Sequence, residues 1–210
     1  MAAQKAYFST LRVIFFRFYL VSYKKNCNFA AFFYLRMART FKIGLVGPES
    51  TGKSTLGQWL AKQLGGTCIP EFARLYVGHL GRPYTYEDVC LIAEQNRKEA
   101  LDSQGLCFYD TELIITKVWL DEVYHKRPEW VTEPIPGACQ MDGYLLLSPD
   151  LPAVPDPLRE NLEQDARERL FRRYLHEIEL TGKPFSIVRG DGEARLQAAL
   201  QAVKCFSGQQ

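Results

Sequence analysis

The chain has 210 residues, 47% of them apolar and 24% charged, which is enough for one domain with a full hydrophobic core. The net charge is only +2 and the six cysteines show no C-x-x-C spacing. Composition therefore argues against a nucleic-acid-binding protein, a disulfide-stapled secreted domain and a zinc site of paired cysteines, and we expect reduced thiols in a cytoplasmic protein.

Residues 1–36 differ in composition from the rest of the chain. They are rich in Phe and Tyr and hold six basic residues but no acidic one, so residues 37–210 carry 20 basic and 24 acidic residues, a net charge of −4. No apolar run reaches the ~20 residues of a membrane span, so we expect no stable membrane insertion. We interpret 1–36 as a basic leader outside the fold and 37–210 as the domain. A mis-assigned start before Met37, a transit peptide and a membrane-surface anchor remain open for the leader.

Apolar segments and amphipathic segments alternate along the domain. The sequence predicts strands over residues 41–46, 67–70, 106–109, 144–147 and 184–188. It predicts helices over residues 54–64, 85–103, 112–124, 159–180 and 195–205. Thr85 and Asp88 have the spacing of a capping box, with Asp88 in place of the usual Glu. The alternation predicts an α/β fold with a parallel five-stranded sheet flanked by helices.

The segment GPESTGKS, residues 47–54, matches the P-loop pattern G-x-x-x-x-G-K-[ST] between a predicted strand and a predicted helix. Backbone N–H groups of such a loop surround phosphates, its Lys reaches the β- and γ-phosphates, and its Ser holds Mg²⁺. A Gly-rich turn that merely caps a helix is the alternative, but strand, loop and helix occur in the order that the motif requires. The residues expected to bind ATP here are Gly47, Glu49, Ser50, Thr51, Gly52, Lys53, Ser54 and Thr55.

Ligands of parallel sheets bind beyond the carboxyl ends of the strands. That rule selects Glu71 and Arg74 after the second predicted strand, Asp110 after the third, Asp150 after the fourth and residues 190–192 after the fifth. We assign Asp110 to Mg²⁺ together with Ser54, and Glu71 to the acceptor hydroxyl as its base, oriented by Arg74. The alternatives are the reverse assignment of the two carboxylates, a helix cap for Asp110, and a surface ion pair for Glu71 and Arg74.

Three function classes are compatible with a P-loop in this setting. A GTPase would need N-K-x-D, which the sequence lacks, and a mechanical ATPase usually has Glu after the Asp of its third strand, where this chain has Thr111. We therefore favour an ATP-dependent kinase that transfers a phosphoryl group to a small hydroxyl acceptor. The alternatives are an ATPase or regulatory switch without an acceptor, and a membrane-binding nucleotide sensor that would use the leader.

Several stretches in order resemble the nicotinamide-riboside kinase domain of bacterial NAD-metabolism regulators and the AAA-labelled P-loop ATPases grouped with it. They are GPESTGKSTL, PEFARLYV, FYDTELIITKVW, YLLLSPDLPAVPDPLR, R-x-x-LF and G-x-x-x-x-R, between about residues 41 and 205. The resemblance implies a nucleoside-kinase-like P-loop fold that uses ATP and Mg²⁺ on a nucleoside or riboside. It implies a helical lid over 156–167 whose Arg159 and Arg167 meet the transferred phosphate, and Gly190 and Gly192 near the adenine. A solvated helix face is the alternative for the arginines.

The sequence departs from this family where the riboside kinases recognise the base. Pro70 stands in place of an aromatic residue that stacks on the nicotinamide ring, and Ala153 in place of a lid Trp. The lid has Asp156-Pro-Leu-Arg159 instead of D-G-L-R. The phosphate machinery is kept while the base pocket is changed, so the resemblance predicts phosphoryl transfer more firmly than nicotinamide riboside as the acceptor.

Overall fold

The structure is a computed structural model that describes residues 40–132, 141–156 and 163–207. The segment Thr40–Gln210 forms one compact unit. The basic leader, residues 1–36, and the lid residue Arg159 lie outside the described residues.

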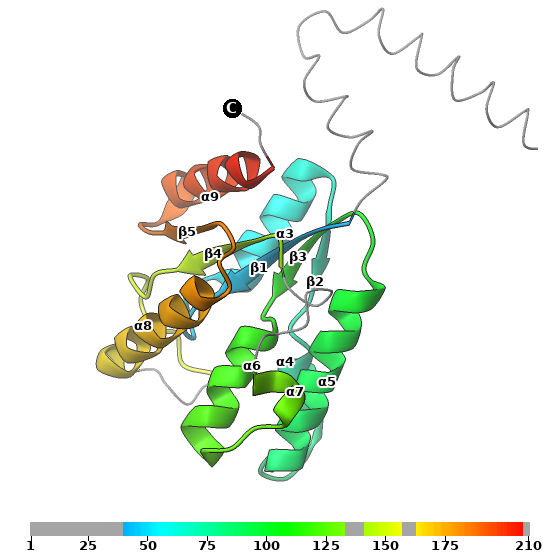
Figure 1. The fold of residues 1–210 in the computed structure, drawn as a ribbon. Coiled ribbons are helices and arrows are strands. Elements are labelled where there is room, and N and C mark those ends of the chain that lie inside the picture. Colours follow the sequence, from blue (N-terminus) through cyan, green and yellow to red (C-terminus); the bar gives the residue numbers. More distant parts are fainter. Residues whose placement is uncertain (1–39, 133–140, 157–162, 208–210) are drawn as a thin grey trace, which may run out of the picture. The chain divides into compact units, whose positions relative to one another are not determined.

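The described core is a single sheet of five parallel strands, as the sequence predicts (Figure 1). The strands are β1 (Phe41–Val46), β2 (Thr67–Ile69), β3 (Leu106–Asp110), β4 (Gly143–Leu147) and β5 (Phe185–Val188). Their order is β2-β3-β1-β4-β5, with Leu45 of β1 opposite both Asp110 of β3 and Leu145 of β4. The chain crosses from one side of β1 to the other, so the loop after β1 lies at the topological switch point where such sheets bind ligands.

Helices connect the strands and differ in detail from the prediction. They are α3 (Lys53–Leu64), α4 (Phe72–His79), α5 (Tyr86–Asp102), α6 (Leu113–Trp119), α7 (Glu129–Thr132), α8 (Gln164–Leu180) and α9 (Gly192–Phe206). The predicted helix 112–124 is α6 continued by a π-helical turn, η1 (Leu120–Tyr124). The short helices α4 and α7 were not predicted. None of the helices in the described segments is long and apolar enough to cross a bilayer.

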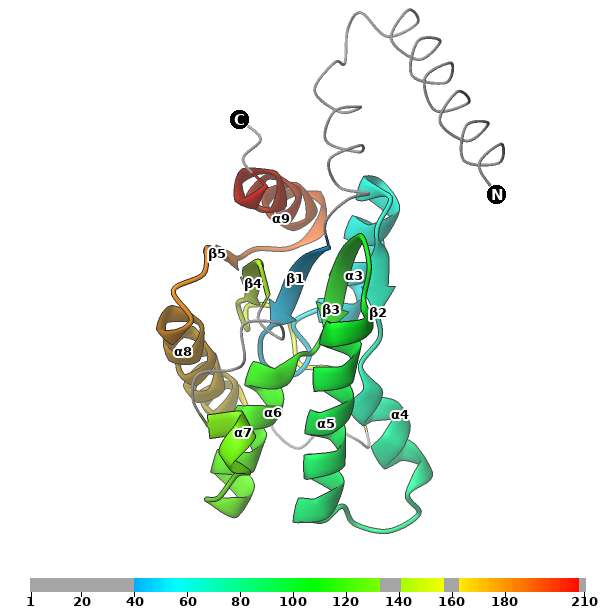
Figure 2. The same ribbon diagram turned by 45° about the vertical axis from the view of Figure 1, so that its right-hand side comes forward.

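Both faces of the sheet are covered by helices (Figures 1 and 2). Successive side chains of a strand point to opposite faces, so Leu45 packs with α3 and α9 while Val46 packs with α6 and α8. Leu60 and Val203 belong to the first of these clusters, and Ile178 to the second. Each such side chain stabilises the fold by about 1.5–3 kcal/mol when fully buried, which makes the sheet a rigid base for the loops at its carboxyl edge.

The capping box predicted at the start of α5 is present. The Asp88 N–H donates to Thr85 Oγ1 over 3.4 Å, and the Thr85 N–H donates to Asp88 Oδ2 over 2.7 Å. Tyr76 and Arg82 also donate to the Asp88 carboxylate. The carboxylate therefore joins α4 and the loop that follows it to the first turn of α5.

Candidate active site

The backbone of the loop between β1 and α3 is tightly wound and depends on its glycines. A Cβ atom on Gly47 would lie 2.7 Å from the carbonyl oxygen of Leu147, so only glycine fits there. Gly52 has φ 79° and Ser50 has φ 58°, both in the left-handed region. Inside the loop the buried Thr51 hydroxyl donates to the carbonyl of Pro48 over 2.9 Å. The loop is thus wound tightly before the helix begins.

Lys53 is the first residue of α3, and its ammonium is bound to the loop itself. Its Nζ donates to the carbonyls of Gly47 over 2.8 Å and Pro48 over 2.9 Å. The side chains of Ser54 and Thr55 are exposed in the same helical turn. No acidic residue lies in the first turn of α3, so nothing there opposes the partial positive charge of the helix N-terminus. This combination of a cation, a helix N-terminus and exposed hydroxyls suits an anionic ligand.

Asp110 is the last residue of β3, which pairs with β1, the strand that leads into the phosphate loop. Its side chain is only 4% exposed. Its Oδ1 is buried and makes no hydrogen bond among the described residues, and the same holds for Oγ1 of Thr111. Thr111 also has φ 83°, a strained conformation for a β-branched residue that costs about 1–3 kcal/mol. A strained backbone and buried oxygens without hydrogen bonds are unusual in folded proteins. They mark the end of β3 as a candidate functional site.

Glu71 lies between β2 and α4, half-buried, and its side chain does not cap α4. Burial raises the pKa of its carboxyl group; the Lys53 charge opposes this rise, and the Asp110 charge adds to it. Glu71 therefore lies close enough to Lys53 and to Asp110 for both charges to act on its carboxyl group. Arg74, expected to orient Glu71, instead forms an ion pair with Asp156 of the loop after β4, although its charge still lowers the Glu71 pKa.

The arrangement fits a Mg²⁺ ion held largely by water and phosphate. Ser54 offers an exposed hydroxyl at the start of α3, and Asp110 offers an unbonded carboxylate oxygen. No cluster of three His, Cys, Asp or Glu residues that could hold a metal occurs in the part of the chain that the structure describes. Mg²⁺ needs none, since it commonly takes one or two protein oxygens and completes its shell with water and substrate phosphates.

Arg167 lies at the phosphate loop, where its guanidinium binds backbone carbonyls. We expected its guanidinium to meet the transferred phosphate. The side chain is 1% exposed, and it donates from Nε to the carbonyl of Glu49 over 3.1 Å and from Nη2 to the carbonyl of Leu151 over 3.0 Å. Arg167 therefore links the phosphate loop to the loop after β4 through backbone carbonyls, and its contact with the transferred phosphate stays a prediction.

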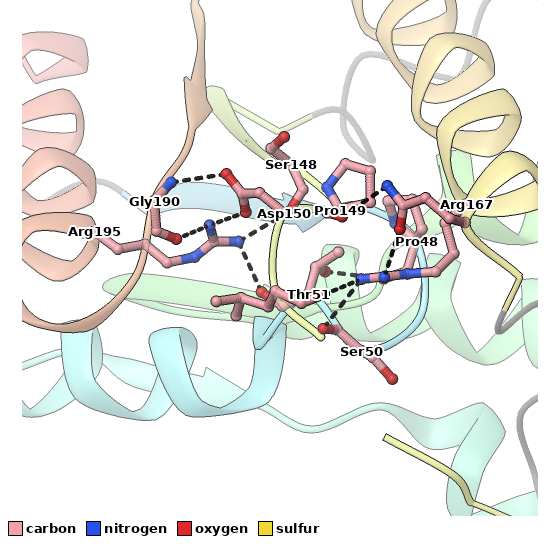
Figure 3. Close-up of polar contacts among 11 residues, drawn as sticks. Pro48, Ser50, Thr51, Ser148, Pro149, Asp150, Arg167, Gly190 and Arg195 are labelled. Atoms are coloured by element: carbon pink, nitrogen blue, oxygen red, sulfur yellow. Dashed lines mark hydrogen bonds and ion pairs between the residues drawn. The ribbon is translucent and has the colours of Figure 1, made fainter. Parts of the chain in front are cut away.

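A second buried arginine, Arg195 of α9, reaches the loop and was given no role from the sequence. Its Nη2 donates to the carbonyl of Thr51 over 2.9 Å, and its Nη1 donates to Asp150 Oδ1 and to the carbonyl of Gly190, both over 2.7 Å (Figure 3). The G-x-x-x-x-R spacing that starts at Gly190 is the signal that could have identified it. Asp150, selected by its strand end, is thus a partner of Arg195.

The loop after β5 was predicted to lie near the adenine. Gly190 has φ 77° and donates its N–H to Asp150 Oδ2 over 2.7 Å, while Gly192 has φ 52° and begins α9. Both residues are exposed at the carboxyl edge of the sheet. Their contact with adenine stays a prediction, as do the roles assigned to the other site residues.

A family model described as an AAA domain, AAA_28, matches residues 42–195, from β1 into α9. The chain belongs to this AAA domain family. The match confirms the resemblance to AAA-labelled P-loop ATPases seen in the sequence. A search of curated protein sequences found no match.

Solved structures share the fold of this AAA-family chain. A NadR protein in complex with NAD and AMP-PNP has a TM-score of 0.58 at 21% identity, and NadR in complex with NR has 0.59 at 19%. Each alignment covers 84% of this chain but 52% of the NadR chain, so the chain spans about half of those proteins. Deoxyadenosine kinase from M. mycoides, with dCMP and dCDP bound, has a TM-score of 0.54 at 15% identity over 79% of this chain and all of its own. The chain therefore shares its α/β fold with NadR and with deoxyadenosine kinase.

Proposed function

We propose that this chain transfers a phosphoryl group from ATP to a hydroxyl of a small molecule of the nucleoside or riboside class. One observation carries the proposal: a lysine-bearing phosphate loop lies at the switch point of the sheet together with two acidic residues on neighbouring strand ends. These are Glu71, whose pKa is raised by burial, and Asp110, whose Oδ1 has no hydrogen-bond partner among the described residues. Kinases need both a phosphate cradle and carboxylates for metal and acceptor.

Each group has a distinct task in this proposal. The loop N–H groups and the α3 N-terminus hold the ATP phosphates, and Lys53 exchanges its carbonyl partners for β- and γ-phosphate oxygens. Ser54 and Asp110 would hold Mg²⁺, which neutralises phosphate charge. Glu71 accepts the proton of the acceptor hydroxyl as its oxygen bonds to the γ-phosphorus and the bond to the ADP oxygen breaks. A raised pKa suits Glu71 to this task, since a base works best near the operating pH.

The fold neighbours support the proposed class of acceptor, and its identity is left to experiment. The neighbours include NadR with NR bound and a deoxyadenosine kinase with deoxynucleotides bound. By the resemblance to the riboside kinases, Pro70 replaces the aromatic residue that stacks on the nicotinamide ring and Ala153 replaces a lid Trp, so we expect the base pocket of this chain to differ. Phosphorylation of nicotinamide riboside would assign the chain to NAD metabolism.

The test is to incubate the full chain with Mg-ATP and a panel of nucleosides, ribosides and nucleotides, nicotinamide riboside included, and to detect phosphorylated products by mass spectrometry. We expect one class of acceptor to gain a phosphoryl group, and we expect the Lys53→Ala variant to form no product. Release of ADP without any phosphorylated acceptor would instead support the ATPase or switch alternative.

A further inference from the structure

Two buried arginines contact the phosphate loop from different elements, Arg167 from α8 and Arg195 from α9, one on each side of the loop in Figure 3. They are 1% and 5% exposed. Arg167 donates to the carbonyls of Glu49 over 3.1 Å and Ser50 over 3.5 Å, and Arg195 donates to the carbonyl of Thr51 over 2.9 Å. The two side chains therefore bind three consecutive carbonyl groups of the loop.

Holding these carbonyls fixes the direction of the N–H groups next to them. A trans peptide group is planar, and its C=O and N–H bonds point in opposite directions. When the carbonyls of Glu49, Ser50 and Thr51 point to guanidinium groups, the N–H groups of Ser50, Thr51 and Gly52 each point away from the guanidinium that binds the carbonyl of the same peptide. That is the orientation in which backbone N–H groups bind an anion, whereas an inward carbonyl would repel phosphate oxygens.

Arg195 is itself held by a carboxylate that reaches a second loop. Asp150 Oδ1 accepts from Arg195 Nη1, and Asp150 Oδ2 accepts from the N–H of Gly190, both over 2.7 Å. Arg195 also donates to the carbonyls of Ser148 over 3.2 Å and Gly190 over 2.7 Å. Only a guanidinium, with five donors in a rigid fork, can bind this many acceptors at once, and lysine cannot replace it.

We propose that Arg167 and Arg195 are positioning residues that hold the phosphate loop in its anion-binding conformation by binding the carbonyls of Glu49, Ser50 and Thr51. They act through the loop and do not touch the phosphates. The inference rests on the proposed function in one respect, that the anion is the phosphate chain of a nucleotide.

The experiment compares Arg167→Met and Arg195→Met with the wild-type full chain, and uses Arg172→Met as control because Arg172 is an exposed residue of α8. Calorimetry measures the affinity for ADP and for inorganic pyrophosphate at a temperature at which circular dichroism shows every variant folded. Loss of hydrogen bonds made by a charged donor corresponds to an affinity about 10- to 100-fold lower. We expect that loss for both ligands in both Met variants, and no change in the control.

The two ligands separate positioning of the phosphate loop from other roles. If Arg195 acts only at the adenine side, its variant will bind ADP more weakly but pyrophosphate with unchanged affinity. If the role is purely structural, the melting temperature will fall but both affinities will stay unchanged. Either result overturns the proposal. If a Met variant does not fold, the Lys variant of the same residue is used, and wild-type affinity in that variant also overturns it. Wild-type protein that binds neither ligand overturns it as well. Protein that binds ADP with the expected arginine dependence but phosphorylates no acceptor overturns the kinase proposal alone.

Discussion

Replacement of Asp110 by Asn is expected to stabilise the nucleotide-free protein while removing its response to Mg-nucleotide. The Asp110 side chain is 4% exposed, and its Oδ1 makes no hydrogen bond within the described residues. A buried polar group without a partner costs about 1–3 kcal/mol, and a charged one costs more. Asn keeps the shape and removes the charge, so we expect a gain of about 1 kcal/mol, equivalent to a melting temperature about 2–4 °C higher for a domain of this size.

Thermal unfolding followed by circular dichroism, with and without Mg-ADP, measures both effects. A ligand at about 100 times its Kd stabilises the protein that binds it by about 2.7 kcal/mol, so the wild type should gain several degrees with Mg-ADP and Asp110→Asn much less. Asp102→Asn, at an exposed position of α5, is the matched control and should behave as the wild type. A nucleotide-free Asp110→Asn protein that melts well below the wild type would refute the reasoning, since the carboxylate would then be held for the fold and not kept for a ligand.

Three further variants test neighbouring parts of the structure. Lys53→Ala should weaken ADP binding by about 100-fold or more but cost less than about 1 kcal/mol of stability, because Lys53 is half-exposed and its ammonium binds carbonyls of its own loop. Unchanged affinity in calorimetry would contradict the P-loop assignment. Glu71→Gln should slow transfer to the acceptor by about 10²–10⁴-fold and leave Mg-ATP affinity nearly unchanged. If Glu71→Gln loses Mg-ATP binding and Asp110→Asn keeps it, Glu71 serves the metal and Asp110 is the base. Lys117→Met should cost about 2–4 kcal/mol in urea unfolding, because it removes the 2.7 Å partner of the buried Glu177 carboxylate while Arg173 remains 3.5 Å from it. Adding Glu177→Leu should restore most of that loss.

Local sequence patterns were enough to predict the parts of the fold that depend on residues close to one another in the chain. The strands β1 and β3 follow from short apolar runs bounded by Gly or polar residues, and the P-loop follows from its glycines between strand and helix. The Thr85 and Asp88 spacing was enough to predict a reciprocal cap. In each case the residues that decide the structure lie within a few positions of one another.

Features that depend on distant contacts could not be predicted. The helix after Trp119 widens into a π-helical turn, a change in hydrogen bonding that periodicity does not reveal. The buried pair of Lys117 and Glu177 joins residues that are 60 positions apart. An arginine in the sequence shows that a charge is present but not which groups it binds, so the sequence did not reveal that Arg167 and Arg195 bind carbonyls of the same loop.

The capping carboxylate Asp88 predicts how stability changes in acid. Arg82 is the main cause of the lowering of its pKa below the usual range, helped by the N–H of Thr85 and the hydroxyl of Tyr76. A carboxylate whose pKa is lower in the folded state than in the unfolded state stabilises the protein above the unfolded value of about 3.9, and that stabilisation is lost as the pH falls further. Asp88→Asn should therefore unfold at lower urea concentration than the wild type at pH 7, and the difference should narrow between about pH 4 and pH 2. Asp102→Asn, with an exposed carboxyl at the other end of α5, should show no such narrowing. A wild-type advantage over Asp88→Asn that stayed constant across that range would mean that the side chain acts by its shape and hydrogen bonds alone, and not by its charge.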